Sequence, residues 1–325
     1  MVGQEDGIVG SVLGAAIGDA LGHPTEFVRS FEAIERKFGA GGVKGYALYW
    51  EREGKRFAPY TDDTQMAELV LRTLSWAREE NADLERAMRF LAKRFVIWSL
   101  QPQGGHRAPG NACLAGCRML AAGDAWDEAG GEDAGGCGSV MRAYPAGLVF
   151  VDDLERAEAW AVAQSKLTHR APIAFAACAA MARATALCLR GAAPAEVTAA
   201  MIEAAARHDA GTAHMIEIAL NEAHTGVEPR VTLQRLQGWA AHECIAAAAY
   251  VFARHPNSFV DAVLEGANTP GDSDSIATLA GALLGARLGV QAIPAEWRAD
   301  LERSDELAEV ASGLCATLAR LQLPM

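Results

Sequence analysis

Apolar residues recur every three and four positions through most of the chain, which is the spacing of one face of an α-helix. The clearest runs are residues 67–80, 85–100, 155–169 and 171–190. Alternating runs of β-branched residues, which are typical of half-buried strands, are scarce. The pattern predicts an all-α protein. Because no long linker or fixed-period repeat interrupts it, we expect a single domain over residues 1–325.

Two stretches break the helical pattern. Residues 123–138 are rich in glycine and acidic residues, and residues 39–60 show no periodicity. Glycine reaches backbone conformations that other residues avoid, so clusters of it mark loops. We therefore expect an irregular loop at each of these places.

Glycines also occur inside two of the predicted helices at intervals of four, which places them on one helix face. They are, in the first helix and then in the second, Gly10, Gly14, Gly18 and Gly22, and Gly281, Gly285 and Gly289. A glycine inside a helix costs about 1 kcal/mol relative to alanine. Close approach of another backbone would offset this cost. We expect the two helices to pack on each other or on a common neighbour and to bring the two ends of the chain together.

The composition narrows the class of protein. The chain has 325 residues, of which 51% are hydrophobic and 22% charged, so it can bury a large core. Its net charge of −12 argues against a nucleic-acid groove and against docking on anionic membranes. Seven cysteines without a Cys-x-x-Cys pair indicate reduced thiols. No run approaches the roughly 18 apolar residues that span a bilayer, and we expect a cytoplasmic monomer without a signal peptide.

Two clusters of Asp, Ser and Thr each precede a strongly helical run. The first is YTDDTQM at residues 60–66, and the second is TPGDSDSI at residues 269–276. Capping of a helix N-terminus explains one such side chain in each cluster. Capping does not explain the rest of each cluster. In both clusters, two carboxylates and their neighbouring hydroxyls fall within four consecutive positions.

Neighbouring buried carboxylates repel each other and must bind protons or a cation. Because neither cluster has His or Cys nearby in the sequence, the ligands would be oxygens, which suit Mg²⁺, Mn²⁺ or Ca²⁺. If the clusters meet, Asp62, Asp63, Asp272 and Asp274 share one small volume with two hydroxyls. That charge is enough for two divalent cations, as in two-metal hydrolytic sites.

A third element is GDALGHPTE at residues 18–26, where Gly22 and Pro24 end the first glycine-bearing helix. Glu26 follows in a loop, where its carboxylate could reach water at the metal site; a solvated loop glutamate is the ordinary alternative. Two Gly-rich stretches, residues 103–111 and 135–142, offer backbone N–H groups of the kind that bind phosphate. Neither stretch is a P-loop or a Rossmann fingerprint.

The motifs GAAIGDALGHPTE, YTDDTQM, GGCGSVMR, THRAP and PGDSDSIATLAGALLG, in this order, resemble the ADP-ribosylglycohydrolase family. The resemblance runs from about Gly10 to Gly289. It implies an all-α orthogonal bundle with a binuclear Mg²⁺ or Mn²⁺ centre. It also implies hydrolysis of the glycosidic bond between ADP-ribose and an acceptor on a protein or small molecule, which reverses ADP-ribosylation.

The resemblance carries over to individual residues. Six side chains are implied as metal ligands: Thr61, Asp62, Asp63, Asp272, Asp274 and Ser275. Glu26 matches the family's acidic residue after GDALG and is implied as catalytic. Contacts with ADP-ribose are implied for Gly105, Asn111, Gly136, Gly138, Ser139, Met141 and His169.

One departure from the family pattern leaves the acceptor open. Arginine-specific relatives often carry an aspartate where this chain has Ala108, so arginine, serine, an acyl ester and a nucleobase all remain candidates. Three other interpretations compete with a hydrolase. An isoprenoid synthase would need DDxxD, which the chain lacks. A crystallin-like structural member and a sensor that binds ADP-ribose without cleaving it are the other two.

Overall fold

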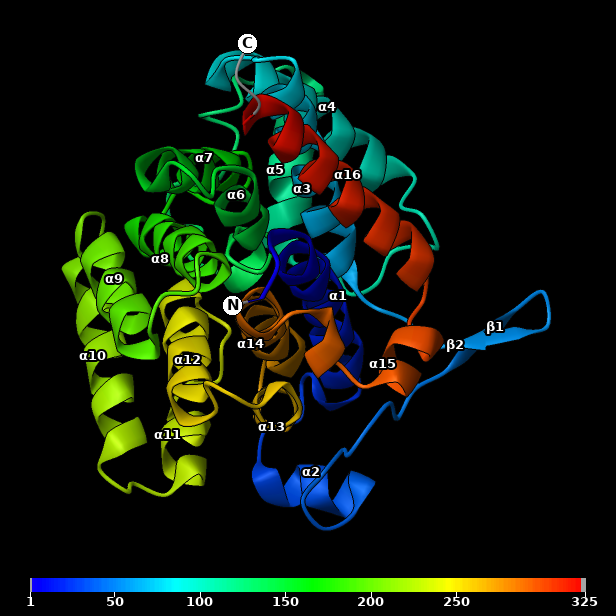
Figure 1. Ribbon diagram of the computed structural model, residues 1–325, viewed down its shortest axis with the longest axis vertical. Coiled ribbons are helices and arrows are strands. Elements are labelled where there is room, and N and C mark those ends of the chain that lie inside the picture. The colour runs from blue at the N-terminus through cyan, green and yellow to red at the C-terminus, as the bar shows by residue number, and fades with distance from the viewer. Residues whose placement is uncertain (1, 323–325) are drawn as a thin grey trace.

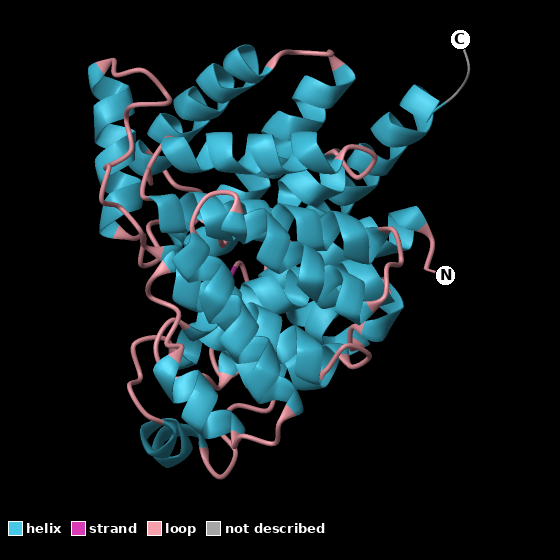
Figure 2. Cartoon of the chain, turned by 90° about the vertical axis from the view of Figure 1, so that its left-hand side faces the viewer, coloured by secondary structure: helices cyan, strands magenta, loops and turns pink. Residues whose placement is uncertain are grey.

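The computed structural model describes residues 2–322 and confirms the all-α class (Figure 1). The helices are α1 (Gln4–Gly22), α2 (Phe31–Phe38), α3 (Asp62–Glu79), α4 (Leu84–Leu100), α5 (Asn111–Ala122), α6 (Tyr144–Val149), α7 (Leu154–Lys166), α8 (Pro172–Leu189), α9 (Pro194–Ala206), α10 (Ala210–His224), α11 (Pro229–Arg235), α12 (Ala241–Arg254), α13 (Phe259–Ala267), α14 (Ser273–Leu288), α15 (Ala295–Asp300) and α16 (Ser304–Gln322). Short 3-10 helices are η1 (His23–Thr25), η2 (Cys137–Ser139) and η3 (Val290–Ala292). Figure 2 shows helices stacked across the whole view.

α1 and α14 run antiparallel with their glycines face to face, as the spacing predicted. A Cβ built on Gly10 would lie 2.5 Å from the carbonyl oxygen of Gly285, and one on Gly14 would overlap the carbonyl oxygen of Gly281. Side chains larger than hydrogen therefore do not fit between the two backbones. Gly289 ends α14 with φ +78°, and it also takes part in the contact, because a Cβ on Gly10 would lie 2.7 Å from its carbonyl carbon. The contact brings the C-terminal end of α1 beside the N-terminal end of α14 (Figure 1).

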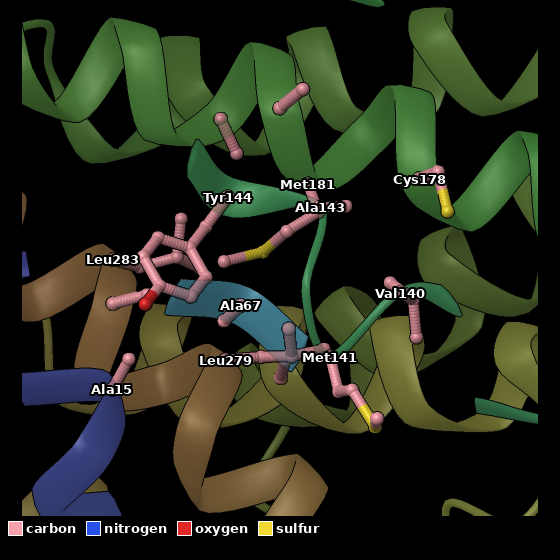
Figure 3. Close-up of a cluster of buried hydrophobic side chains, with 14 of the residues drawn as sticks. Ala15, Ala67, Val140, Met141, Ala143, Tyr144, Cys178, Met181, Leu279 and Leu283 are labelled. Atoms are coloured by element: carbon pink, nitrogen blue, oxygen red, sulfur yellow. The ribbon is translucent and has the colours of Figure 1, made fainter. Parts of the chain in front are cut away.

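A continuous cluster of apolar side chains surrounds this helix pair. Figure 3 shows the Tyr144 ring of α6 close to Leu283 of α14 and Ala15 of α1, with Met181 of α8 nearby. All four residues are at most 2% exposed. The cluster fixes α1 and α14 at the centre of the molecule, and it therefore fixes the positions of the motifs at their ends.

α8 corrects the expectation that no segment is apolar enough to cross a bilayer. Its 18 residues meet that requirement by length and composition. In the fold, however, 72% of the helix is buried, and it packs against α6, α7, α9, α12 and α14. A predominantly apolar helix is also what the centre of a large helical core requires. The apolar surface of α8 is thus covered by its own chain.

The irregular stretch at residues 39–60 contains a small hairpin that the pattern did not predict. β1 (Trp50–Arg52) pairs antiparallel with β2 (Lys55–Phe57). Glu53 and Gly54 join the strands with φ of +55° and +74°, which is typical of a type I′ turn. The hairpin projects from the helical body (Figure 1). Because most of its residues are exposed, it has no buried face to produce an alternating pattern.

Candidate metal centre

The YTDDTQM motif forms the start of α3. Thr61 is the N-cap, and its hydroxyl accepts a hydrogen bond from the N–H of Asp63 at 3.2 Å. The buried carboxylate of Asp19, near the end of α1, accepts the N–H groups of Thr61 at 2.9 Å and Thr64 at 3.0 Å. It also accepts the Thr64 hydroxyl at 2.6 Å. Because Thr61 and Asp19 satisfy these donors, the carboxylates of Asp62 and Asp63 are free for other partners.

The second motif forms the turn before α14 and the first residues of that helix. Gly271 has φ +110°, and its extra room is needed because a Cβ there would lie 2.7 Å from the side chain of Gln237. The Ser273 hydroxyl donates to the carbonyl oxygen of Gly22 at 3.0 Å and lies 3.0 Å from the Thr25 hydroxyl. These bonds tie the start of α14 to the end of α1.

The two acidic motifs meet, as the sequence predicted. The Ser275 hydroxyl donates a hydrogen bond to the carboxylate of Asp63 at 2.9 Å, across 212 positions of sequence. The four aspartates of the motifs are 3–5% exposed: Asp62, Asp63, Asp272 and Asp274. Carboxylates from the two ends of the chain therefore share one buried volume.

Burial and mutual repulsion both disfavour the ionised form of these carboxyls. Burial raises the pKa of Asp62 to about 7, and the charge of Asp19 adds to the rise. Burial, followed by the neighbouring carboxylates, raises the pKa of Asp63, Asp272 and Asp274 well above its usual range. Within residues 2–322, no lysine or arginine forms an ion pair with any of the four motif aspartates. The cluster is therefore built to bind protons or a cation.

Glu26 lies beside the cluster, in the loop after α1. The N–H of Phe27 donates to the carbonyl oxygen of Gly271 at 3.0 Å, which fixes this loop against the second motif. His23 Nδ1 lies 3.3 Å from Glu26 Oε2. His23, Glu26 and Asp274 each offer a ligand atom within 4.8 Å of the others. Burial, with repulsion from nearby aspartates, raises the pKa of Glu26 to about 8.

Cys137 is a further residue at the centre that the sequence reasoning did not place there. Its thiol donates to Asp272 Oδ2 at 2.5 Å, and its sulfur lies 3.7 Å from the hydroxyl oxygen of Ser275. His23 and Cys137 are distant from the acidic motifs in the sequence, but the fold brings both of them next to the motifs. The sequence contained a signal for this, because His23 lies in the motif GDALGHPTE and Cys137 lies in the motif GGCGSVMR.

The Gly-rich loop around η2 is fixed from several sides. The N–H of Cys137 donates to the carbonyl oxygen of Trp239 at 3.1 Å. The carbonyl oxygen of Gly138 accepts from the buried guanidinium of Arg142 at 2.6 Å. A Cβ on Gly138 would lie 2.7 Å from Cys113 Sγ. The loop thus holds Gly136 and Gly138 half-buried next to the acidic cluster.

Three predicted substrate contacts lie behind this loop. Ser139, Met141 and His169 are 0%, 2% and 2% exposed. The Ser139 hydroxyl oxygen accepts from Ser165 at 2.8 Å, and His169 Nδ1 lies 2.7 Å from the Thr168 hydroxyl. Burial lowers the pKa of His169 to about 3, so its ring is neutral. These buried side chains support the loop from the interior, and their contact with ADP-ribose stays a prediction.

The second Gly-rich loop, residues 103–111, packs on the start of α3. Gln65 Nε2 donates to the carbonyl oxygen of Gly105 at 3.2 Å. Arg107 and Glu302 form a buried ion pair with Nη2–Oε1 at 3.0 Å, which anchors the loop to the C-terminal part of the chain. Gly105 and Asn111 stay exposed, and Asn111 begins α5.

An exposed aromatic pair borders the centre. Phe27 follows Glu26 and is 60% exposed, whereas Trp239 precedes α12 and is 39% exposed. Their rings stack with centroids 5.3 Å apart and an interplanar angle of 26°. Phe27 holds φ +63°, a conformation that non-glycine residues rarely adopt. The pair offers a planar apolar surface next to the acidic cluster, and the sequence pattern gave no indication of it.

Comparison with known proteins identifies this arrangement. A family model described as ADP-ribosylglycohydrolase matches residues 2–323. The chain belongs to the ADP-ribosylglycohydrolase family.

Curated relatives of this ADP-ribosylglycohydrolase family member extend over nearly its whole length. It is 28% identical to the ADP-ribosyl-[dinitrogen reductase] glycohydrolase of Rhodospirillum rubrum, covering 93% of this chain and 92% of the relative. It is 28% identical to the ADP-ribosylarginine hydrolase Tri1 of Pseudomonas putida, covering 94% and 76%. It is 25% identical to the mouse ADP-ribosylhydrolase ARH3, covering 94% and 90%. A solved structure titled ADP-ribosylglycohydrolase-related protein complex matches with a TM-score of 0.69 at 25% identity, covering 97% and 98%.

The structure of this ADP-ribosylglycohydrolase family member brings most predicted site residues together. The acidic centre gathers Glu26, Thr61, Asp62, Asp63, Asp272, Asp274 and Ser275. The loop positions Gly105, Asn111, Gly136 and Gly138 are exposed or half-buried. Sequence reasoning missed Asp19, although an aspartate inside an apolar, glycine-bearing helix is itself a signal, because a buried carboxylate needs donors.

Proposed function

We propose that this family member is a hydrolase that cleaves the glycosidic bond between ADP-ribose and an acceptor, and so reverses ADP-ribosylation. The names of its relatives describe this kind of activity. The observation that carries the proposal is the hydrogen bond between Ser275 and Asp63, which joins two acidic motifs in one buried site. Within residues 2–322 no lysine or arginine forms an ion pair with this cluster. Buried carboxylates without such a partner are costly to maintain, and binding of cations and substrate explains them.

The donor set fits two hard divalent cations, which we propose to be Mg²⁺ or Mn²⁺. The proposed ligands are Thr61, Asp62, Asp63, Asp272, Asp274 and Ser275. Bound there, the cations would supply charge neutralisation and Lewis-acid polarisation of the ribose hydroxyls. Asp19 takes no part in ligation in this proposal, because its carboxylate is already bonded to the start of α3.

Glu26 is the residue that we propose to carry a proton in the reaction. Cleavage of a glycosidic bond passes through an oxocarbenium-like state, which needs a proton at the leaving group and an attacking water. With a pKa raised to about 8, the carboxyl has both its protonated and its ionised form accessible near neutral pH. Protonated, it can donate to the leaving group; ionised, it can accept a proton from water. His23, 3.3 Å away, holds the carboxyl in place.

The surrounding loops provide surfaces for the rest of ADP-ribose. We propose that backbone N–H groups near Gly105, Gly136 and Gly138 bind the diphosphate, which is compatible with a net charge of −12 because peptide dipoles, not side chains, supply the positive potential. The stacked rings of Phe27 and Trp239 offer a surface on which a base can stack.

The proposal is tested with a panel of ADP-ribosylated substrates of defined linkage: arginine, serine, acyl ester and nucleobase. We expect release of ADP-ribose from at least one substrate, loss of release in EDTA, and recovery with Mg²⁺ or Mn²⁺. Full activity in EDTA would contradict the metal centre. Binding of ADP-ribose without turnover of any substrate, at saturating Mg²⁺ and Mn²⁺, would contradict a hydrolase and favour a sensor.

A further inference from the structure

A cavity of about 360 Å³ lies between α3 and α4, next to the start of α16. Both α4 and α16 pack against α3 (Figure 1). Each of the two long helices lines the cavity with residues three and four positions apart, which share one helix face: Gln65, Glu68 and Arg72 from α3, and Arg94, Ile97 and Gln101 from α4. Pockets for small molecules usually measure about 300–1,000 Å³, so this cavity is large enough for a ligand of modest size.

Three arginines line the cavity, and two of them have carboxylate partners. Glu68 Oε1 lies 2.8 Å from Arg72 Nη2, and Glu68 Oε2 lies 2.8 Å from Arg303 Nη1. Arg303 also forms an ion pair with Glu306 at 2.6 Å. The third arginine, Arg94, forms no ion pair or side-chain hydrogen bond within residues 2–322. Two carboxylates thus offset three guanidinium groups, which leaves one positive charge uncompensated at the cavity.

The guanidinium of Arg94 is half-buried beside its own helix. Its Cζ lies 4.6 Å from the ring centroid of Phe90, one turn earlier on α4. Burial, followed by the charge of Arg72, lowers the pKa of Arg94. Because arginine does not lose its proton in proteins, an anion bound between the two guanidinium groups would relieve this repulsion.

The other groups that line the cavity indicate the kind of anion. Gln101 and Gln103 carry exposed side-chain amides, which add N–H donors to those of the arginines. A carboxylate is satisfied by one planar guanidinium fork, whereas the terminal oxygens of a phosphate accept bonds from several directions. Leu69 and the 63% exposed Ile97 add apolar surface. Several donors beside an apolar wall suit a phosphate group attached to a small organic part.

We propose that this cavity is a second ligand site, separate from the acidic centre, which binds the phosphate group of a small phosphorylated molecule through Arg72 and Arg94. The organic part of the ligand lies against Leu69 and Ile97. The proposed hydrolase does not account for this site, because its phosphate contacts are backbone N–H groups of the Gly-rich loops.

Gln65 connects the cavity with the Gly-rich loop at residues 103–111. It lines the cavity, and its Nε2 donates to the carbonyl oxygens of Gln103 at 2.7 Å and Gly105 at 3.2 Å. Its Oε1 accepts the indole N–H of Trp98, another lining residue, at 2.9 Å. A ligand in the cavity therefore lies against the side chain that holds this loop in place. Binding at the second site does not itself depend on the proposed function.

The test is calorimetric titration of the Mg²⁺-loaded protein with phenyl phosphate and with benzoate, which carry different anionic groups on the same ring. Each titration is run with and without saturating ADP-ribose, which occupies the acidic centre in the proposed function. We expect phenyl phosphate to bind more tightly than benzoate in both conditions. Arg94→Gln and Arg72→Gln should each weaken its binding by about tenfold or more, the usual effect of losing a charge-assisted hydrogen bond.

Arg89→Gln is the matched control, because it removes the same charge from the same helix outside the cavity. Arg89 is 73% exposed and pairs with Glu85, and it does not line the cavity. Its replacement should leave the affinity for phenyl phosphate unchanged. Circular dichroism verifies that each variant is folded, and the use of two positions, 72 and 94, guards against the failure of one variant.

Four results would overturn the proposal. They are no binding of phenyl phosphate by the wild type, tighter binding of benzoate, an equal loss of affinity in all three variants, and loss of phenyl phosphate binding when ADP-ribose is added. The last result would assign the cavity to the substrate's own site. None of these titrations measures release of ADP-ribose, so the proposed hydrolase stands or falls separately.

Discussion

Five aspartates are buried around the centre, and they differ in how their charge is compensated. Asp19 accepts hydrogen bonds from two backbone N–H groups and a hydroxyl at the start of α3. The aspartates of the two motifs instead face one another, and within residues 2–322 none of them forms an ion pair with a lysine or arginine. Asp19 therefore organises local structure, whereas the motif aspartates retain the capacity to bind a cation.

Replacing Asp272 with asparagine tests that capacity. The amide is nearly the same size, so the variant should fold, but it removes one negative charge from the cluster. We expect the bound-metal content, measured by mass spectrometry of the loaded protein, to fall together with ADP-ribose release. Asp124→Asn, at an exposed loop position, should change neither quantity. An unchanged metal content in Asp272→Asn would remove this residue from the ligand set.

Replacing Glu26 with glutamine separates proton transfer from metal binding. The amide cannot carry the proton, so we expect turnover to fall by about 10²-fold or more, the usual contribution of a general acid or base. Metal content should stay at the wild-type value. The control is Glu32→Gln, an exposed residue at the start of α2, whose turnover should match that of the wild type. Wild-type turnover in Glu26→Gln would dismiss its assigned role.

At the scale of elements, the contact between α1 and α14 decides where the motifs lie. Their backbones approach so closely that an added methyl group on either helix meets the carbonyl groups of the other. The glycines that weaken each isolated helix thus permit the one packing arrangement that joins the motifs. η1 and the turn at Gly271 then position Glu26 and Asp272 from the two helix ends.

We expect Gly14→Ala to lower the free energy of unfolding by about 1–3 kcal/mol or more, because the new methyl group overlaps Gly281 and forces the helices apart. Gly313→Ala is the matched control. Gly313 lies in α16 with nothing within 4 Å of an added Cβ, so alanine there should stabilise the protein by up to about 1 kcal/mol. Urea unfolding of the two variants compares the effects. Equal changes in the free energy of unfolding would refute the interpretation that these glycines are needed for the close contact between α1 and α14.

At the scale of the whole molecule, cations at the centre would join the first 63 residues to the segment after residue 271. Ligands that bind only the folded state stabilise it, by about 2.7 kcal/mol at one hundred times the dissociation constant. In the absence of cations the same carboxyls make folding depend on pH, because their pKa is higher in the folded chain than in the unfolded chain.

The direction in which stability changes with pH follows from the raised pKa values. A carboxyl whose folded pKa is raised contributes its full stability below its ordinary pKa of about 4, and this contribution is lost as the pH rises through the folded value. The pKa in the folded protein is about 7 for Asp62 and about 8 for Glu26. In EDTA, we therefore expect thermal unfolding at a lower temperature at pH about 9 than at pH about 6. Saturating Mg²⁺ should raise the unfolding temperature and reduce this difference. An unfolding temperature in EDTA that does not change with pH would contradict the prediction.

Local patterns determined much of the fold and part of the site. Helical periodicity predicted the all-α class, and the glycine spacing predicted the close helix contact, because both depend on positions within one helix. The convergence of the acidic motifs followed from the glycines beside them. The hairpin at Trp50–Arg52 and Lys55–Phe57 escaped prediction because it is too short and too exposed to carry a pattern.

Only the tertiary structure decided which residues surround the acidic cluster and which are buried behind it. His23 and Cys137 join the cluster, and Ser139, Met141 and His169 support a loop from the interior. Sequence spacing reports neighbours along one helix or one turn. Proximity between distant segments, and burial with it, depends on how all the helices pack, and that packing is a property of the complete chain.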